Sequence, residues 1–315
     1  MIPLSMFVLA HLSDPHLGPL PAARLAEISG KRALGYLNWH RSRRGRHRPE
    51  VLAALVQDLK GAGADHIVVT GDLVNLALRA EFGPARQWLS DLGPPHDVTV
   101  IPGNHDAYMR DAVLHSADYW GDYMRGDGAA GSERTSHFPF VRHRGPLALI
   151  GLSTAVPTGP LLATGRLGQT QLQRLGSILT RLDEEGRYRV VLIHHPPTSP
   201  RRKHFKRLTD DAALRHVLAE HGAELVLHGH SHVHSLIWLE GPRGRIPVVG
   251  VPSASASLQA DVDPAAYNLY RITREAADWR CEAICRGLLA GAPGILELGR
   301  QELRLTRHKQ RGDCQ

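Results

Sequence analysis

Residues 97–106 have the sequence DVTVIPGNHD, in which an apolar run of strand length ends in Gly103-Asn104-His105-Asp106. Four more stretches share this design, in which a short aliphatic or β-branched run is followed at once by side chains that bind metals or transfer protons. They end at Asp14-Pro15-His16, at Gly71-Asp72, at His194-His195 and at Gly229-His230-Ser231-His232. The pattern predicts five buried strands that deliver their ends to one place.

The side chains at these strand ends are carboxylates, an amide oxygen and imidazoles, a set that suits divalent ions such as Mn²⁺, Fe²⁺ or Zn²⁺. No cysteine is among them, which argues against a structural thiolate zinc site. Two such ions at about 3.5–4 Å repel strongly unless an anionic group lies between them. We predict that Asp72 is this bridge, because the preceding Gly71 has no side chain to crowd a close approach of backbone to the ions.

With these five blocks in this order, the sequence resembles the calcineurin-like metallophosphoesterase family from Asp14 to His232. The family pattern is D-x-H, then G-D, then G-N-H-D, then a strand-terminal His, then G-H-x-H. The resemblance implies that one metal is held by Asp14, His16, Asp72 and His232, and the other by Asp72, Asn104, His194 and His230. It also implies that His105 acts beside the substrate phosphoryl group, as general acid or oxygen-stabilising donor, with Asp106 orienting its ring.

Two adjacent histidines, His194 and His195, compete for one ligand position, because side chains alternate faces at the end of a strand. We favour His194, since the family's ligand is usually the first His of an H-H-P run. His228 directly precedes the Gly-His-Ser-His block and is a candidate for a supporting role beside the ligands. Histidines without a motif are interpreted as surface or structural residues, namely His11, His66, His96, His115, His137, His143, His216, His221 and His234.

The resemblance further implies an α/β fold of metallophosphoesterase type, a four-layer α/β/β/α sandwich of two mixed sheets with the metals at the loop end. Residues 1–300 are expected to form a single domain, because the ligands come from both ends of one continuous region, and residues 301–315 are expected to form a polar C-terminal tail. The β-α-β-α-β order of the first half favours parallel pairing. Strands near 234–239, 246–251, 266–272 and 279–285 are predicted to form a second sheet. Residues 108–136 are interpreted as a long surface connection, with a mobile flap over the pocket as the alternative.

The expected activity is that of a phosphodiesterase that cleaves a small anionic phosphodiester, such as a 3′,5′-cyclic nucleotide, through a metal-bridging hydroxide. An alternative is a hydrolase that resembles UDP-2,3-diacylglucosamine pyrophosphatase and acts at the membrane surface. A third hypothesis, from another class, is a binding or scaffold protein that kept the fold and lost the chemistry. The complete set of ligand positions argues against this third hypothesis.

The composition of the chain indicates which partners and which cellular compartment to expect. The formal net charge of +7 suits anionic partners, and a hydrophobic content of 42% is ample for a buried core. The three cysteines cannot build a disulfide framework and fit a reducing compartment. The apolar start of the chain runs directly into Asp14 and is interpreted as the first strand rather than a signal peptide. A cytoplasmic protein is therefore expected.

Two basic segments lie outside the five motif blocks described above. Residues 31–48 combine dense Arg and Lys with Leu34, Tyr36, Leu37 and Trp39. Three interpretations stay open for this segment: a solvated basic helix or loop, a phosphate-steering rim beside the metals, or a patch that makes peripheral contact with anionic lipid. Residues 201–207 begin close to a proposed ligand and are a candidate for lining the pocket. Neither segment carries a recognisable nucleic-acid-binding module, which disfavours nucleic acid as a partner.

Overall fold

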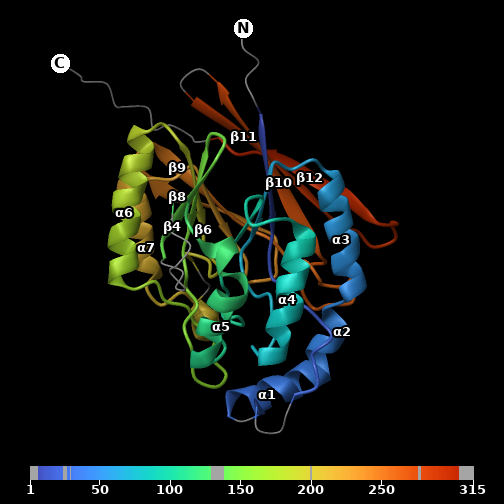
Figure 1. Cartoon of the computed structure of the whole chain (residues 1–315). Helices are drawn as coiled ribbons and strands as arrows, with labels where there is room; N and C mark the ends of the chain where they lie inside the picture. Colours follow the sequence, from blue (N-terminus) through green and yellow to red (C-terminus); the bar gives the residue numbers. More distant parts are fainter. Residues whose placement is uncertain are drawn as a thin grey trace, which may run out of the picture.

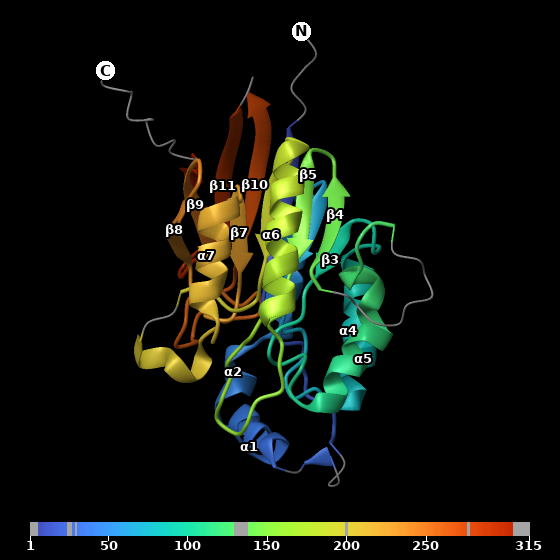
Figure 2. The same ribbon diagram turned by 90° about the vertical axis from the view of Figure 1, so that its left-hand side faces the viewer.

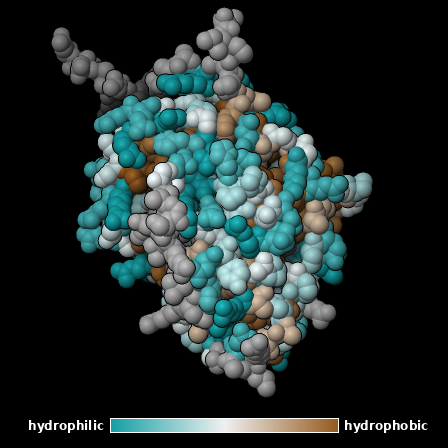
Figure 3. All heavy atoms as spheres, in the orientation of Figure 1, coloured by the Kyte–Doolittle hydropathy of each residue, from teal (hydrophilic) through white to brown (hydrophobic). Residues whose placement is uncertain are grey.

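The structure is a computed structural model that describes residues 6–23, 27–28, 30–128, 138–198, 201–275 and 278–304 (Figure 1). Most of the C-terminal tail expected at 301–315 lies outside these ranges. Within them, no helix combines the length and the apolar character that a membrane span requires. The face shown in Figure 3 is largely hydrophilic, with apolar residues in small separate patches. Many apolar side chains of the described residues are buried in the core instead.

Two mixed sheets form the centre of the molecule. The first has the strand order β12-β11-β10-β1-β2-β3, with β1–β2 and β2–β3 parallel and the other pairs antiparallel. Its strands are β1 (Phe7–Leu12), β2 (His66–Val69), β3 (Val98–Val100), β10 (Ala266–Glu275), β11 (Asp278–Leu288) and β12 (Ile295–Glu302).

The second sheet has the order β4-β5-β6-β7-β9-β8, with a parallel centre from β5 to β9 and an antiparallel strand at each edge. Its strands are β4 (Phe140–Arg144), β5 (Leu147–Gly151), β6 (Tyr188–Leu192), β7 (Leu225–His228), β8 (Ser235–Gly241) and β9 (Gly244–Gly250). Because parallel strands place their carboxyl ends at one edge, each sheet presents several loop starts side by side.

Helices cover the outer faces of both sheets. Helices α6 and α7 lie over the second sheet and face the viewer in Figure 2, whereas α3 and α4 lie on the opposite side of the molecule (Figure 1). The α/β/β/α sandwich is thereby confirmed. The helices are α1 (Lys31–Asn38), the π-helix η2 (Trp39–Arg43), α2 (Arg44–Arg46), α3 (Pro49–Gly61), α4 (Arg79–Leu92), α5 (Arg110–Trp120), the 3₁₀-helices η3 (Gly121–Met124) and η4 (Arg201–Lys206), α6 (Gln169–Glu184) and α7 (Asp211–His221).

The strand sequences explain the layering through their period of two. In β5, Leu147 and Leu149 join the core between the sheets, whereas Ala148 and Ile150 join the core beneath α6 and α7. All five residues of this strand are buried, as expected for a strand covered on both faces. Because the parallel strands are packed between the two cores, the positions of their ends are fixed.

Two expectations about the elements of the chain are wrong. Strands β10 and β11 do not join β8 and β9 in a second sheet; β10 pairs antiparallel with β1, so both belong to the first sheet with β12. The segment expected to be a long connection over 108–136 contains α5 and η3 in its described part. Trp120, at the end of α5, stacks on Phe82 of α4 with ring centroids 5.1 Å apart, so tertiary packing supports a helix whose own pattern is weak.

Candidate metal centre

The expected ligand residues lie in loops that start at strand ends of both sheets. Asp14 and His16 follow β1, Asp72 follows β2, and Asn104 follows β3, all in the first sheet. The second sheet contributes the other three, of which His194 follows β6 while His230 and His232 follow β7. The face-to-face packing of the sheets brings these loops together at one end of the molecule.

Asp14, His16, Asp72 and His232 form a first group in which one potential ligand atom from each residue lies within 4.8 Å of the others. His232 Nε2 lies 3.1 Å from Asp14 Oδ1 and 3.3 Å from His16 Nε2. His16 Nε2 lies 3.8 Å from Asp72 Oδ2. Two carboxylates and two imidazoles thus converge on one point, which is the arrangement that a divalent ion needs.

Asp72, His194 and His230 form a second group under the same 4.8 Å limit. His194 Nε2 lies 3.4 Å from Asp72 Oδ2, and Asn104 Oδ1 lies 3.2 Å from His194 Nε2 and 2.8 Å from His230 Nδ1. Asp72 is a member of both groups. A carboxylate in that position can lie between two ions, which is what bridging requires.

The electrostatics of the two groups fit divalent cations. Burial opposes the charged form of Asp72, yet His194, His105 and His16 hold the pKa of its carboxyl well below the usual range. Burial likewise disfavours the charged form of His194, but Asp72 raises its pKa to about 9. Without a metal, a proton on His194 therefore balances the buried carboxylate. A dication can take the place of that proton, because imidazole must be neutral to bind a metal. These residues fit two divalent ions.

The backbone at the ligand positions is unusual. Asp14, His16, Asp72, His230 and His232 all have positive φ angles, between 41° and 65°. Non-glycine residues adopt this left-handed region rarely, at a cost of order 1–3 kcal/mol each, and such residues cluster at functional sites. The loops are therefore shaped to aim these side chains, at some cost in stability.

Glycines allow the loops after β2 and β3 to touch. A Cβ atom on Gly71 would lie 2.5 Å from Gly103 N and 2.8 Å from His194 Nδ1, and φ at Gly71 is +99°. A Cβ atom on Gly103 would overlap the Asp72 carboxylate. Gly71 therefore allows a close approach of the neighbouring loop and the His194 ring, whereas the expected approach of backbone to the ions stays a prediction.

Backbone carbonyls orient two of the imidazoles. His194 Nδ1 lies 2.6 Å from the carbonyl oxygen of Thr70, and His230 Nε2 lies 2.8 Å from the carbonyl oxygen of Lys206. A ring nitrogen that donates to a carbonyl leaves the other ring nitrogen as the metal donor, which fixes both tautomer and orientation. His194 therefore presents Nε2, and His230 presents Nδ1, to the second group.

The ring of His105 is oriented by Asn75 and not, as we expected, by Asp106. His105 Nδ1 lies 2.5 Å from the carbonyl oxygen of Asn75. The Asp106 carboxylate instead accepts hydrogen bonds of 2.8–3.1 Å from the backbone N–H groups of residues 72, 73, 74 and 103. Burial and the nearby Asp72 raise the pKa of Asp106 to about 7, which these donors oppose. Asp106 therefore braces the loop that carries Asp72.

His195 and His228 lie next to the ligand groups without belonging to them. His195 Nδ1 lies 2.7 Å from Thr154 Oγ1, its Nε2 lies 3.1 Å from the carbonyl oxygen of Ala163, and burial lowers its pKa to about 3. The structure thus brings His194 into the second group and turns His195 toward the loop after β5. His228 Nδ1 lies 3.1 Å from its neighbour's carbonyl oxygen, and burial lowers its pKa to about 4.

Both basic segments reach the site. A cavity of about 140 Å³ is lined by Arg46, His47 and Lys206 together with Asp72, Asn104, His105, His230 and His232. This placement favours the phosphate-steering interpretation for residues 31–48 and the pocket-lining role for residues 201–207. The side chains of residues 42–44 and 201–203 lie outside the described part of the structure.

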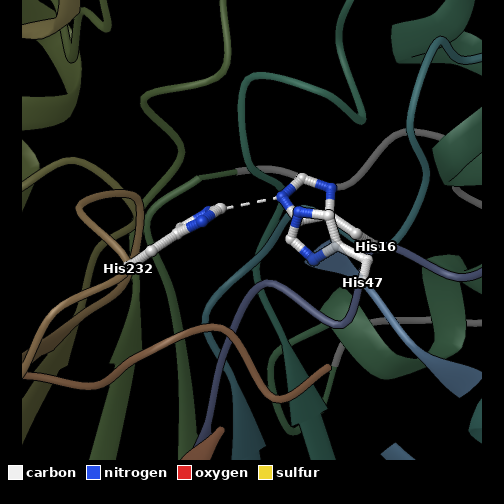
Figure 4. A group of neighbouring side chains, drawn as sticks. All are labelled: His16, His47 and His232. Carbon is white, nitrogen blue, oxygen red and sulfur yellow. Dashed lines mark hydrogen bonds between the residues drawn. The ribbon is translucent and has the colours of Figure 1, made fainter. Parts of the chain in front are cut away.

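His47 is a site residue that sequence reasoning missed. Its ring lies against that of His16, with centroids 4.5 Å apart, and near that of His232 (Figure 4). It belongs to none of the five blocks, and its one signal in the sequence is its place at the end of a basic segment. Only the folded chain shows that this segment returns to the strand ends.

A family model described as calcineurin-like phosphoesterase matches residues 7–234. A relative from Synechococcus sp., described as a probable cyclic nucleotide phosphodiesterase, is 25% identical over 234 residues, which cover 73% of this chain and 80% of the relative. Among solved structures, a dimetal phosphatase from Danio rerio has a TM-score of 0.60 at 14% identity, covering 95% of this chain and 99% of that one.

A purple acid phosphatase from yellow lupin (Lupinus luteus) has a TM-score of 0.57 at 12% identity and covers 90% of this chain and 52% of its own. At such identities the two solved structures show a shared fold. The family match spans all five blocks and every ligand position described above.

Proposed function

Because this chain belongs to the calcineurin-like phosphoesterase family, we propose that it hydrolyses a small anionic phosphodiester, such as a 3′,5′-cyclic nucleotide. The family establishes the coarser statement, that the chain is a metal-dependent phosphoric ester hydrolase with a dinuclear divalent centre. The preference for a diester is supported by the Synechococcus relative, which is described as a probable cyclic nucleotide phosphodiesterase.

One observation carries the proposal: members of both ligand groups line a single cavity together with His105 and the cationic residues Arg46 and Lys206. Its volume of about 140 Å³ suits a phosphoryl group with a small substituent and leaves the remainder of an ester near the opening. The cations attract the anion to this opening, and the low dielectric of the cavity strengthens their effect.

The two ions, when bound, would supply positive charge for the phosphoryl oxygens and acidify a water molecule. Asp14, His16, Asp72 and His232 would hold one, and Asp72, Asn104, His194 and His230 the other. His105 has its Nδ1 engaged by Asn75, which directs Nε2 to the cavity. From there it can stabilise or protonate the leaving oxygen. Arg46 and Lys206 hold the substrate at the opening.

The first test compares bis(p-nitrophenyl) phosphate with p-nitrophenyl phosphate, followed by cyclic AMP, on the metal-loaded protein and on a chelated sample. We expect faster turnover of the diester, cleavage of cyclic AMP, and loss of both activities after chelation. Turnover of the monoester alone would refute the diester preference and leave the coarser assignment in place. We propose Mn²⁺, Fe²⁺ or Zn²⁺ as the native ions, and elemental analysis of the purified protein identifies them.

A second candidate function follows from apolar side chains exposed on three segments around the site. Hydrogen bonds join these segments: Lys31 Nζ donates to Thr158 Oγ1 (2.7 Å), and Ala163 N donates to the carbonyl oxygen of Phe205 (2.9 Å). Exposed leucines beside a basic cavity suit a substrate with acyl chains, such as UDP-2,3-diacylglucosamine, presented by a membrane surface. The exposed side chains are Leu34, Leu37, Leu161, Leu162 and Phe205.

Sedimentation with phosphatidylglycerol vesicles separates the two candidates. The membrane-surface function predicts binding that Leu34→Ser with Leu37→Ser weakens several-fold, together with cleavage of UDP-2,3-diacylglucosamine. The matched control is Leu296→Ser with Leu298→Ser, two leucines of similar exposure on β12. Equal binding by both double variants, or no binding at low salt, would remove this candidate.

A further inference from the structure

His47 lies at the wall of the cavity beside the first ligand group. One of its ring nitrogens lies within 4.8 Å of ring nitrogens of both His16 and His232. The ring centroid is 4.5 Å from that of His16 and 5.7 Å from that of His232, as the close-up in Figure 4 shows. Three imidazoles from distant parts of the sequence therefore face one another.

His47 adjoins the first ligand group through its two imidazoles and not through its carboxylates. The group within 4.8 Å that contains both carboxylates is Asp14, His16, Asp72 and His232, without His47. Within the described residues, His47 forms a separate group with His16 and His232 alone, which contains no carboxylate. His47 thus lies beside the first group and lines the cavity that we propose as the substrate site.

The backbone on either side of His47 is fixed by the loop after β9. His47 forms an isolated bridge with Ala256, Arg48 N donates to the carbonyl oxygen of Ser255 (2.9 Å), and Ser257 N donates to that of Arg46 (2.8 Å). This anchoring places the end of the basic segment rigidly. A rigid support is what a substrate-binding side chain needs.

Two serine hydroxyls contact one nitrogen of the ring. His47 Nδ1 lies 2.9 Å from Ser255 Oγ and 3.2 Å from Ser253 Oγ. The Ser253 hydroxyl donates its proton to the carbonyl oxygen of Asp14 (2.6 Å). The Ser255 hydroxyl can therefore donate to Nδ1, and the ring proton then lies on Nε2.

We propose that His47 donates a hydrogen bond from Nε2 to a phosphoryl oxygen of the substrate, so that it acts together with His105 on the same phosphoryl group. Both rings lie beside that of His16, with centroid separations of 4.5 Å for His47 and 4.9 Å for His105. Both also line the same cavity. The inference rests on the proposed phosphoesterase function and adds a residue that no family block contains.

The test uses metal-loaded wild-type protein, His47→Ala and His47→Gln. We expect His47→Ala to lower kcat/KM by about 10²-fold, the scale of one lost donor to a developing negative charge. Calorimetric titration with inorganic phosphate should show about tenfold weaker binding, and metal content should not change. His47→Gln keeps a donor and should recover part of both losses. Rates on p-nitrophenyl and phenyl esters should fall by the same factor, because the contact is to the phosphoryl group and not to the leaving group.

The matched control is His40→Ala in the same segment, where the ring packs on Tyr36 and Trp39. Loss of one metal equivalent in His47→Ala would make His47 a ligand and overturn the proposal. Phosphate affinity and kcat/KM within twofold of the wild type would reduce His47 to a packing role. If wild-type protein turns over no ester, the proposed function fails, and phosphate binding still tests His47 by itself.

Discussion

His105 illustrates how one residue depends on several others that carry no chemistry of their own. Its ring is held by the Asn75 carbonyl, and the loop around Asn75 is held by Glu81, whose carboxylate accepts hydrogen bonds from the backbone N–H groups of Asn75 (2.7 Å) and Leu78 (2.8 Å). Glu81 lies in the first turn of α4. The start of a helix thus positions a side chain in the cavity.

Replacing His105 by Ala should lower kcat by about 10²–10⁴-fold, the range for loss of a general acid or an oxygen-stabilising donor. The metal content should stay at the wild-type value, because His105 belongs to neither ligand group. Steady-state kinetics and elemental analysis on the same preparation check both parts. Unchanged kcat would remove His105 from the mechanism.

Asp72→Ala should lose at least one metal equivalent, because Asp72 is the residue shared by the two ligand groups. It should also lower the pKa of His194, whose imidazolium loses its nearest carboxylate, 3.4 Å away. Elemental analysis measures the first effect and NMR titration of metal-free protein the second. Asp97→Ala, at a surface carboxylate outside both groups, is the control. Full occupancy in Asp72→Ala would refute the bridging role.

The motif residues could be predicted from the sequence, because metal chemistry restricts which side chains can occupy a ligand position. The role of Asn75 could not be predicted, because this residue acts through its backbone carbonyl, a group that every residue has. The place of His47 in the site could not be predicted either. Nothing near this residue in the sequence indicates that it contacts Ser255, more than two hundred positions later. Residues that act through their backbone or through distant contacts leave no local pattern.

At the scale of elements, strand patterns identified most strands and the parallel pairing of β1, β2 and β3, but not the partners of β10 and β11. The alternation around residues 266–285 is typical of a strand in either sheet, and it does not specify that β10 pairs antiparallel with β1. Helix α5 was missed for a related reason, since its aromatic end is stabilised by stacking on α4 rather than by helix propensity. Strand pairing and side-chain packing are tertiary properties. They determine the partner of β10 and the formation of α5, and neither can be read from local sequence.

Gly103→Ala tests the contact between the loops after β2 and β3. A methyl group there would overlap the Asp72 carboxylate and lie 2.5 Å from the Asp72 backbone nitrogen. We expect the free energy of unfolding to fall by about 1–3 kcal/mol, the usual cost of forced overpacking, and metal occupancy to fall with it. Denaturant unfolding and elemental analysis are the measurements.

Gly299→Ala is the control for this substitution, because a Cβ atom on Gly299 in β12 meets nothing within 4 Å. It should leave metal occupancy unchanged. Equal stability and occupancy in both alanine variants would show that the two loops can move apart, and the close approach would then have no role in shaping the site.

At the scale of the whole molecule, the two sheets are connected by the metal site, because both contribute ligand residues. The first ligand group takes Asp14, His16 and Asp72 from the first sheet and His232 from the second, and the second group also takes residues from both. Bound ions would therefore stabilise the sandwich as a unit, by about 4 kcal/mol for an ion present at a thousand times its dissociation constant. This linkage explains how the strained backbone at the ligands can be tolerated.

Acid should destabilise the metal-free sandwich through buried neutral histidines. Burial lowers the pKa of His66 to about 2 and that of His11 to about 3. His66 contacts the hydroxyl of Thr99 in β3, and His11 contacts that of Thr70 directly after β2. An unfolded histidine has a pKa of about 6.5, so between that pH and its folded pKa the unfolded chain binds more protons. Each group then lowers the free energy of unfolding by about 1.4 kcal/mol per pH unit as the pH falls, and has no effect above pH 6.5.

His66→Gln isolates one of these contributions, because glutamine can keep a hydrogen bond to Thr99 and does not titrate. Urea unfolding of chelated protein at several pH values between 7.5 and 4.5 should show a slope that is smaller by about 1.4 kcal/mol per pH unit below pH 6. His216→Gln, at a side chain that is 80% exposed, should keep the wild-type slope. A wild-type slope in His66→Gln would mean that water reaches this ring in the native state, and that the core of the first sheet opens before the molecule unfolds.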